Sequence, residues 1–210
     1  MSLSTYKTQL ADGRMLQIED TELERFAKDV GLDNIAPGRY SLLFVFKFVL
    51  YTTIEGIEAN FILQELKRLE GLSHDAIETK APTQFSKEPL KGLWHQHFFS
   101  ARFIPKNIAS HMPPKKVEAT VKRIFDAAES PVVTKEMIHE LASALTHGAM
   151  EERASQKKLT GEWIVFAKHD KKNYYLTLTV HPTDRTTGDQ AIFDEINDMA
   201  FAQFPFLMRN

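Results

Sequence analysis

Residues Leu159–His181, LTGEWIVFAKHDKKNYYLTLTVH, contain the strongest pattern in this chain. Two apolar, aromatic-rich runs flank the polar break Asp170-Lys171-Lys172-Asn173, which is typical of an antiparallel β-hairpin. We predict a register in which Asp170 pairs with Asn173. Side chains alternate along a strand, so this register gives the hairpin one apolar face and one mixed face.

The mixed face combines an acid, a base and hydroxyl groups. In the predicted register Glu162 lies across from His181, and Lys168 lies across from Tyr175. A histidine and a carboxylate can share the roles of general acid and base, and a lysine can stabilise charge on a phosphoryl oxygen. We hypothesise a catalytic set for metal-independent RNA cleavage. It has His181 as acid or base, Glu162 as its partner, Lys168 on the phosphate, and Tyr175 and Thr177 positioning the substrate.

An alternative interpretation is structural, because the same face also contains Ile164 and Phe166, which the last helix could cover. Helices followed by an antiparallel sheet with polar residues on its open face are also the general plan of small bacterial ribonuclease toxins. No motif of those toxins matches this chain residue by residue, so no family is assigned.

Composition narrows the class of protein. The chain has 210 residues, of which 43% are hydrophobic and 26% charged, as in ordinary globular proteins. It has no cysteine, which excludes disulfides, thiolate nucleophiles and cysteine-based metal sites and favours a cytoplasmic location. The start shows no secretory signal pattern. The apolar run 42–54 is too short to span a membrane and contains Lys47, so we expect no membrane association.

Charge is segregated along the chain. Residues 1–79 carry 8 Lys and Arg against 13 Asp and Glu, residues 80–125 carry 9 against 2, and residues 126–210 carry 9 against 13. The change predicts an acidic N-terminal helical subdomain with a short hairpin, 1–79. A second part, 80–210, would combine a basic helical segment with the C-terminal hairpin and helix. A single domain over 1–210 is the alternative.

The basic segment Lys87–Arg123 is a candidate surface for phosphate. Cations interleaved with aromatic residues can neutralise phosphates and stack on bases. The candidate phosphate-binding residues are His95, Arg102, Lys106, Lys115, Lys116, Lys122 and Arg123. The alternative is that the acidic flanks pack beside this segment and neutralise it.

The order of the predicted elements gives the fold class. We predict an α+β fold, mostly helical, with an N-terminal hairpin and a C-terminal antiparallel β-hairpin packed against helices. The N-terminal hairpin turns at Asp12-Gly13. Apolar spacing predicts helices after Thr21, over 42–54 (where a strand is the alternative), over 54–71, over 90–101 and after Pro114, with a last helix capped by Asp189.

His95-Gln96-His97 resembles a metal-binding pair. On the helix predicted for 90–101, residues two apart point to nearly opposite sides, so we expect neither a metal site nor a cofactor. The chain also lacks an HExxH motif, a glycine-rich phosphate loop and a GxSxG motif.

These patterns lead to one functional hypothesis and one alternative. The first is a cytoplasmic protein that binds nucleic acid or a phosphorylated small molecule. The second is a non-catalytic interaction or dimerisation module, which exposure of Phe204, Phe206 and Leu207 in the apolar tail would favour.

Overall fold

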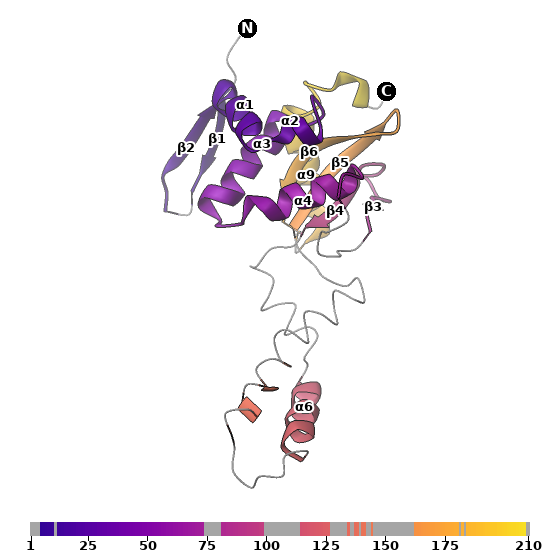
Figure 1. Cartoon of the computed structure of the whole chain (residues 1–210). Helices are drawn as coiled ribbons and strands as arrows, with labels where there is room; N and C mark the ends of the chain where they lie inside the picture. Colours follow the sequence, from indigo (N-terminus) through magenta and orange to yellow (C-terminus); the bar gives the residue numbers. More distant parts are fainter. Residues whose placement is uncertain are drawn as a thin grey trace. The chain divides into compact units, whose positions relative to one another are not determined.

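The structure is a computed structural model, and the chain divides into two compact units (Figure 1). The first consists of Met1–Ala76, Ala81–Phe98 and Gly161–Asn210, and the second of Ile77–Lys80 and Phe99–Thr160. The described residues are 5–10, 12–73, 81–98, 114–126, 134, 137–138, 140–141, 144, 162–180, 182 and 184–208.

The first unit begins with the predicted hairpin. Strands β1 (Thr5–Gln9) and β2 (Met15–Glu19) pair antiparallel, and Gly13 in the turn has φ of 84°, a conformation that glycine adopts without strain. Helix α1 (Asp20–Asp29) starts one residue later, because Glu19 and Glu22 form a reciprocal capping box at its N-terminus. The short α2 (Leu32–Ile35) follows.

Helix α3 (Leu42–Val49) confirms the helical prediction for this apolar run. The Ser41 hydroxyl accepts a hydrogen bond from the Phe44 amide at 3.0 Å and donates to the carbonyl of Leu176 at 2.6 Å. One side chain therefore caps the helix and fastens it to the C-terminal hairpin. The run continues as a π-helical turn, η1 (Leu50–Ile54), before helix α4 (Ala59–Leu69).

The main sheet is larger than the predicted hairpin. It has four antiparallel strands in the order β3-β4-β5-β6. They are β3 (Thr83–Gln84), β4 (Trp94–Phe98), β5 (Glu162–His169) and β6 (Lys172–Thr179). The α+β class and both hairpins are confirmed, whereas the description as mostly helical understates the sheet.

The prediction of a helix over 90–101 is wrong for residues Trp94–Phe98, which form strand β4. Gly92, with φ of 86°, interrupts the chain before Trp94, and the following residues pair with β5. The spacing of Leu90, Leu93 and Trp94 fits a helix, but it is only a local preference. Pairing of β4 with β5, which is distant in sequence, outweighs that preference.

The predicted register of the C-terminal hairpin is also wrong. Trp163 lies opposite Thr179 instead of Val180, and Lys168 lies opposite Asn173 instead of Tyr175. A β-bulge between Val165 and Phe166 changes the register within the hairpin. Because a one-residue shift moves a side chain to the other face, the single mixed face that we predicted does not exist.

Each face of the sheet packs against different elements. On one face, Tyr175 contacts Phe44 of α3 at a ring-centroid distance of 5.9 Å, and Phe98 contacts Tyr51 of η1 at 6.3 Å. On the other face, Tyr174 contacts Phe204 of the C-terminal tail at 5.3 Å. All side chains of β5 from Glu162 to Ala167 are buried, so β5 is the centre of the core.

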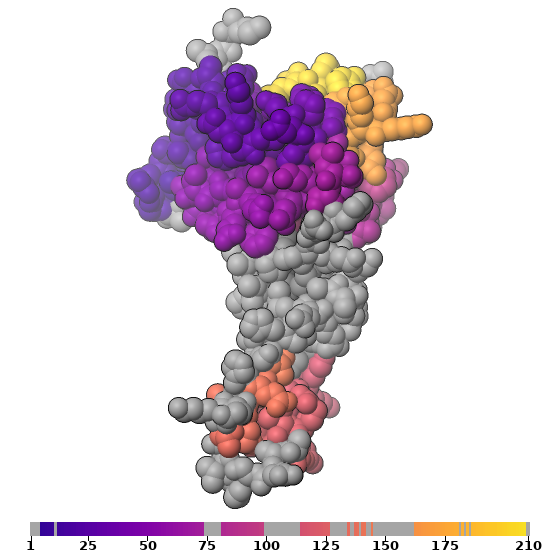
Figure 2. Space-filling view, viewed as in Figure 1, coloured from indigo at the N-terminus to yellow at the C-terminus, as the bar shows by residue number. Residues whose placement is uncertain are grey.

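Helix α9 (Arg185–Met199) and the 3-10 turn η4 (Pro205–Leu207) complete the first unit. The Lys47–Glu195 ion pair, at 2.5 Å, joins α3 to α9. In the tail, Gln203 accepts a hydrogen bond from the Leu42 amide at 2.9 Å. Figure 2 accordingly shows the yellow C-terminal residues directly against the indigo N-terminal elements. The tail therefore packs onto the body of the first unit.

Helix α6 (Pro114–Asp126) is the main described element of the second unit. It begins at Pro114, as predicted, and buries Ile124. The subdomain boundary that we predicted after residue 79 lies outside the described residues and stays a prediction. Within the described residues, no helix has the length and apolar character needed to cross a membrane.

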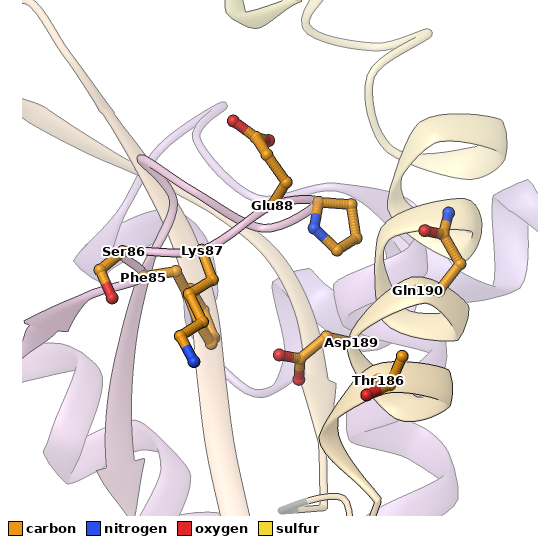
Figure 3. Close-up of a pocket in the computed structure, with 8 residues that line it drawn as sticks. Phe85, Ser86, Lys87, Glu88, Thr186, Asp189 and Gln190 are labelled. Carbon is orange, nitrogen blue, oxygen red and sulfur yellow. The ribbon is translucent and has the colours of Figure 1, made fainter.

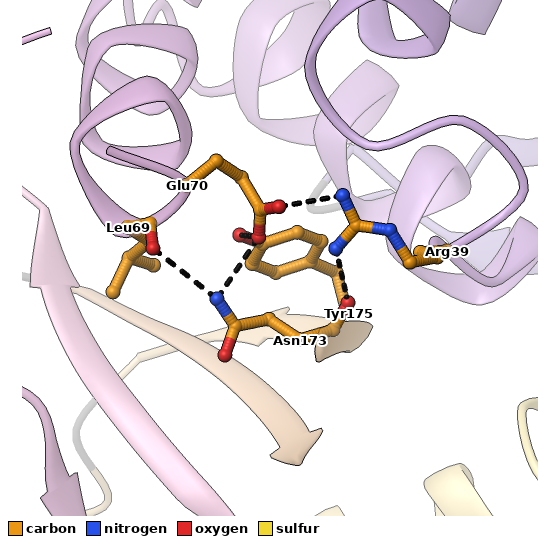
Figure 4. Close-up of polar contacts among 5 residues, drawn as sticks. All are labelled: Arg39, Leu69, Glu70, Asn173 and Tyr175. Atoms are coloured by element: carbon orange, nitrogen blue, oxygen red, sulfur yellow. Dashed lines mark hydrogen bonds and ion pairs between the residues drawn. The ribbon is translucent and has the colours of Figure 1, made fainter. Parts of the chain in front are cut away.

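A carboxylate network fastens α4 to the sheet (Figure 4). Glu70, directly after α4, accepts hydrogen bonds from Arg39 at 2.5 Å, from the Tyr175 hydroxyl at 2.6 Å and from the Asn173 amide at 2.9 Å. Arg39 also donates to the carbonyl of Asn173 at 2.9 Å. The backbone beside Arg39 pairs with the edge of β6, since the Ser41 amide donates to the carbonyl of Tyr175 at 2.9 Å. This pairing covers part of an edge that would otherwise be open.

The network changes how its members titrate. Burial raises the pKa of the Tyr175 hydroxyl, and the hydrogen bond to Glu70 raises it further. Burial alone would also raise the pKa of Glu70, but the hydrogen bonds from Arg39, Tyr175 and Asn173 outweigh burial and hold that pKa below its ordinary value. Glu70 therefore stays ionised in the folded protein.

We predict that Glu70→Gln lowers the free energy of unfolding by about 2–4 kcal/mol at neutral pH, because Arg39 loses its buried partner. In the wild type, the contribution of the ionised Glu70 to the free energy of unfolding is fully present above the pKa of this group in the unfolded state, about 4.3. It is lost as pH falls through the lower pKa of the folded state. The difference between variant and wild type should therefore shrink in acid. Urea unfolding at neutral and acidic pH measures it, with the exposed Glu24→Gln as control. A variant as stable as wild type at neutral pH would contradict the prediction.

Candidate ligand-binding pocket

The loop between β3 and β4 presents polar side chains to the outside. The Phe85 amide donates to the carbonyl of Leu93 at 2.9 Å, and the Gly92 amide donates to the carbonyl of Phe85 at 2.9 Å, which closes the loop. Leu90 is fully buried and anchors the loop in the core. With its apolar end fixed, the loop leaves Ser86 and Lys87 exposed.

The first turn of α9 faces this loop. Asp184 is the N-cap, not Asp189 as predicted, and its carboxylate accepts hydrogen bonds from the Thr186 amide at 3.0 Å and the Thr187 hydroxyl at 2.8 Å. These hydrogen bonds lower the pKa of Asp184, and the bond from the Thr187 hydroxyl has the largest effect. Asp189 consequently lies inside the helix, one turn further on.

An open pocket of about 440 Å³ lies between the loop and the helix (Figure 3). Its size falls within the range of small-molecule sites. Three side chains come from α9, and the others come from the loop. The lining residues are Phe85, Ser86, Lys87, Glu88, Pro89, Thr186, Asp189 and Gln190.

Two lining groups of opposite charge have no partner among the described residues. Asp189 Oδ1 is buried and accepts no hydrogen bond from any described residue. Lys87 forms no ion pair within the described part of the chain, whereas its neighbour Glu88 pairs with Lys91 at 3.8 Å. A buried acceptor without a donor costs about 1–3 kcal/mol, so Asp189 needs an explanation beyond stability.

Aromatic rings lie behind the pocket. Phe85 contacts His95 at a centroid distance of 4.6 Å and Trp163 at 5.5 Å. The Trp163 indole donates to His97 Nε2 at 3.3 Å. Since an indole nitrogen can only donate, His97 must accept with Nε2 and carry its proton on Nδ1.

His95 and His97 share one face of the sheet, with ring centroids 5.6 Å apart. The expectation that they point to opposite sides was wrong, because they lie on a strand instead of a helix. Within the described residues, no group of three or more His, Asp or Glu side chains is suited to hold a metal ion.

The described members of the predicted catalytic set lie apart from this pocket. Glu162, Thr177 and Tyr175 are fully buried, and Tyr175 and Thr177 point to opposite faces of the sheet. The Thr177 hydroxyl donates to the carbonyl of Leu178 at 3.2 Å. The ammonium of Lys168 lies 3.8 Å from the ring centroid of Trp94. His181 lies outside the described residues.

The predicted phosphate-binding residues fall into three places. His95 lies half-buried in β4 behind Phe85. Arg102 and Lys106 lie outside the described residues. The other four lie on α6, where Arg123 pairs with Glu140 at 3.5 Å. On that helix, Lys116 is half-buried and the remaining three are exposed: Lys115, Lys122 and Arg123. Their assignment to phosphate stays a prediction.

Sequence reasoning missed most of the pocket. The predicted basic segment begins at Lys87, but the last helix was predicted to begin only at Asp189. A polar segment over 182–190 that contains three threonines, two aspartates and Gly188 was the available signal. Only the structure shows that residues from Arg185 onward form the first turns of α9 beside the β3–β4 loop.

Comparison of this chain with models of known families, with curated proteins and with solved structures finds no match. The pocket must therefore be interpreted from its own chemistry.

Gly188 allows α9 to approach Pro182 closely. An added Cβ would overlap Pro182 Cβ and lie 3.1 Å from its Cγ. Alanine normally stabilises a helix relative to glycine by about 1 kcal/mol. We predict the opposite sign here, a loss of about 1–3 kcal/mol for Gly188→Ala in urea unfolding, because of overpacking. The exposed Ala191→Gly serves as the propensity control. A stabilised Gly188→Ala would show that the contact is not tight.

Proposed function

We propose that this protein binds a phosphate-bearing ligand, a nucleic acid or a phosphorylated small molecule, in the pocket between the β3–β4 loop and α9. The observation that supports the proposal is the presence of Lys87, without an ion pair among the described residues, beside hydroxyl donors in an open pocket. The hydroxyl groups of Ser86 and Thr186 can donate to phosphate oxygens that the lysine attracts. We place this activity in the cytoplasm, because the chain has no cysteine.

The charges in the pocket restrict what it binds. Glu88 is paired with Lys91, so the charges that remain for a ligand in the pocket are those of Lys87 and Asp189. A plain inorganic anion would meet the Asp189 carboxylate as well as the lysine. A ligand that carries a phosphate at one end and hydrogen-bond donors at the other satisfies both. Nucleotides and single-stranded nucleic acids have this character.

The proposal extends to binding alone. Phosphodiester cleavage by Glu162, Tyr175 and Thr177 gains no support from side chains that are fully buried and belong to two sheet faces. Strand scission that disappears in His181→Ala while binding persists would nevertheless support the catalytic hypothesis.

We predict that the protein binds fluorescently labelled single-stranded RNA, measured by anisotropy, more weakly at about 200 mM than at about 50 mM salt. Lys87→Gln should weaken binding and reduce the slope of log affinity against log salt by about 0.7, the value for one phosphate contact. Lys7→Gln, which removes an exposed lysine from β1, is the matched control. Absent binding at low salt would reject the nucleic-acid form of the proposal, and equal effects of both variants would reject Lys87 as the phosphate contact.

The alternative function is an interaction module, and the C-terminal tail offers one observation in its favour. Phe204 is buried, but Phe206 and Met208 are each 48% exposed. Exposed apolar residues of this size are common at protein interfaces.

If the tail forms an interface between copies, sedimentation velocity should show a dimer whose fraction rises with protein concentration. Phe206→Ser should lower that fraction, since it removes exposed apolar area. Met15→Ser, at an exposed residue of β2, is the control. A monomer at every concentration would reject dimerisation through the tail.

A further inference from the structure

We propose that Asp189 recognises the base of a guanine nucleotide, so that the pocket selects guanine over the other bases. This inference rests on the proposed function, because it assumes that the phosphate of the same ligand reaches Lys87. It begins with the carboxylate itself. Asp189 projects from α9 into the pocket wall, and its Oδ1 atom is buried without a hydrogen bond from any described residue.

A carboxylate accepts hydrogen bonds and cannot donate them while ionised. The ligand must therefore bring donors to Asp189. Guanine presents two adjacent donors, N1–H and the N2 amino group, which match two carboxylate oxygens in the bidentate manner of arginine. Adenine and cytosine place an acceptor nitrogen beside their amino group. Uracil places its single N–H between two carbonyl oxygens. Guanine is the one common base with two adjacent donors on this edge.

The other lining groups fit a base and a phosphate. Phe85, whose ring forms part of the wall, can contact the flat face of a base. The Thr186 hydroxyl, also on α9, can donate to the O6 atom of guanine. Gln190 is engaged along the helix, because its amide donates to Asp194 at 2.7 Å, so we give it no role in recognition. Lys87 lies on the loop side, where it can meet the phosphate.

The experiment compares mononucleotides by isothermal titration calorimetry. Wild-type protein should bind GMP about 10- to 100-fold more tightly than AMP, CMP or UMP, as expected for one bidentate contact. IMP, which lacks the N2 amino group, should fall between GMP and AMP.

Asp189→Asn should abolish the preference for GMP and create one for XMP. The asparagine amide can donate to the C2 carbonyl of xanthine and accept from its N1–H. A gain of binding cannot arise from misfolding. Asp198→Asn, which removes an exposed acid from the same helix, should leave the preference for GMP unchanged.

The outcomes separate this inference from the proposed function. Equal affinity for all nucleotides, or an unchanged preference in Asp189→Asn, would overturn guanine recognition. If Lys87→Gln still weakened RNA binding in that case, the proposed function would stand without it. If neither nucleotide nor RNA bound, both would fail.

Discussion

The fold depends on the pairing of β4 with β5. Phe98 and Glu162 are partners in this ladder, although Phe99–Thr160, most of the second unit, lies between them in the sequence. The chain thus leaves the sheet at one strand end and returns at the position directly opposite. Loop-closure entropy grows slowly with loop length, so a long insertion at such a point is tolerated if the ladder is stable. Burial of every β5 side chain from Glu162 to Ala167 supplies that stability.

Local signals explain which parts of the fold the sequence predicts. The turns at Asp12-Gly13 and Asp170-Lys171 and the cap at Ser41 act within a few residues. The two hairpins and the helix beside these signals were predicted, although the register of the C-terminal hairpin was not. Strand β4 was mistaken for a helix, because Trp94 and its neighbours also fit helical spacing and their strand partner lies far along the chain. The bulge after Val165 gave no sequence signal, and it changed the register on which the mixed face depended.

The same distinction applies to the candidate site. A charge count is local, and it included Lys87 in the basic segment. The pocket requires the β3–β4 loop and α9 to meet, although about half of the chain separates them. No spacing rule links Lys87 to Asp189, because their proximity is a product of the sheet and of the helix packed beside it. The chemical types present in the pocket were visible in the sequence, but their association was not.

Two carboxylates show how structural and functional acids differ in this protein. Glu70 receives three hydrogen bonds, of which the one from Arg39 is also an ion pair, and these outweigh the cost of its burial and fasten α4 to β6. Asp189 has a buried oxygen with no donor among the described residues, and it lies beside an open pocket. Selection for stability alone would favour a neighbouring donor at such a position. A buried acceptor kept unsatisfied by the protein is most simply explained if a ligand supplies the donor. For this reason we assign recognition to Asp189 and structure to Tyr175, whose hydroxyl is already bound.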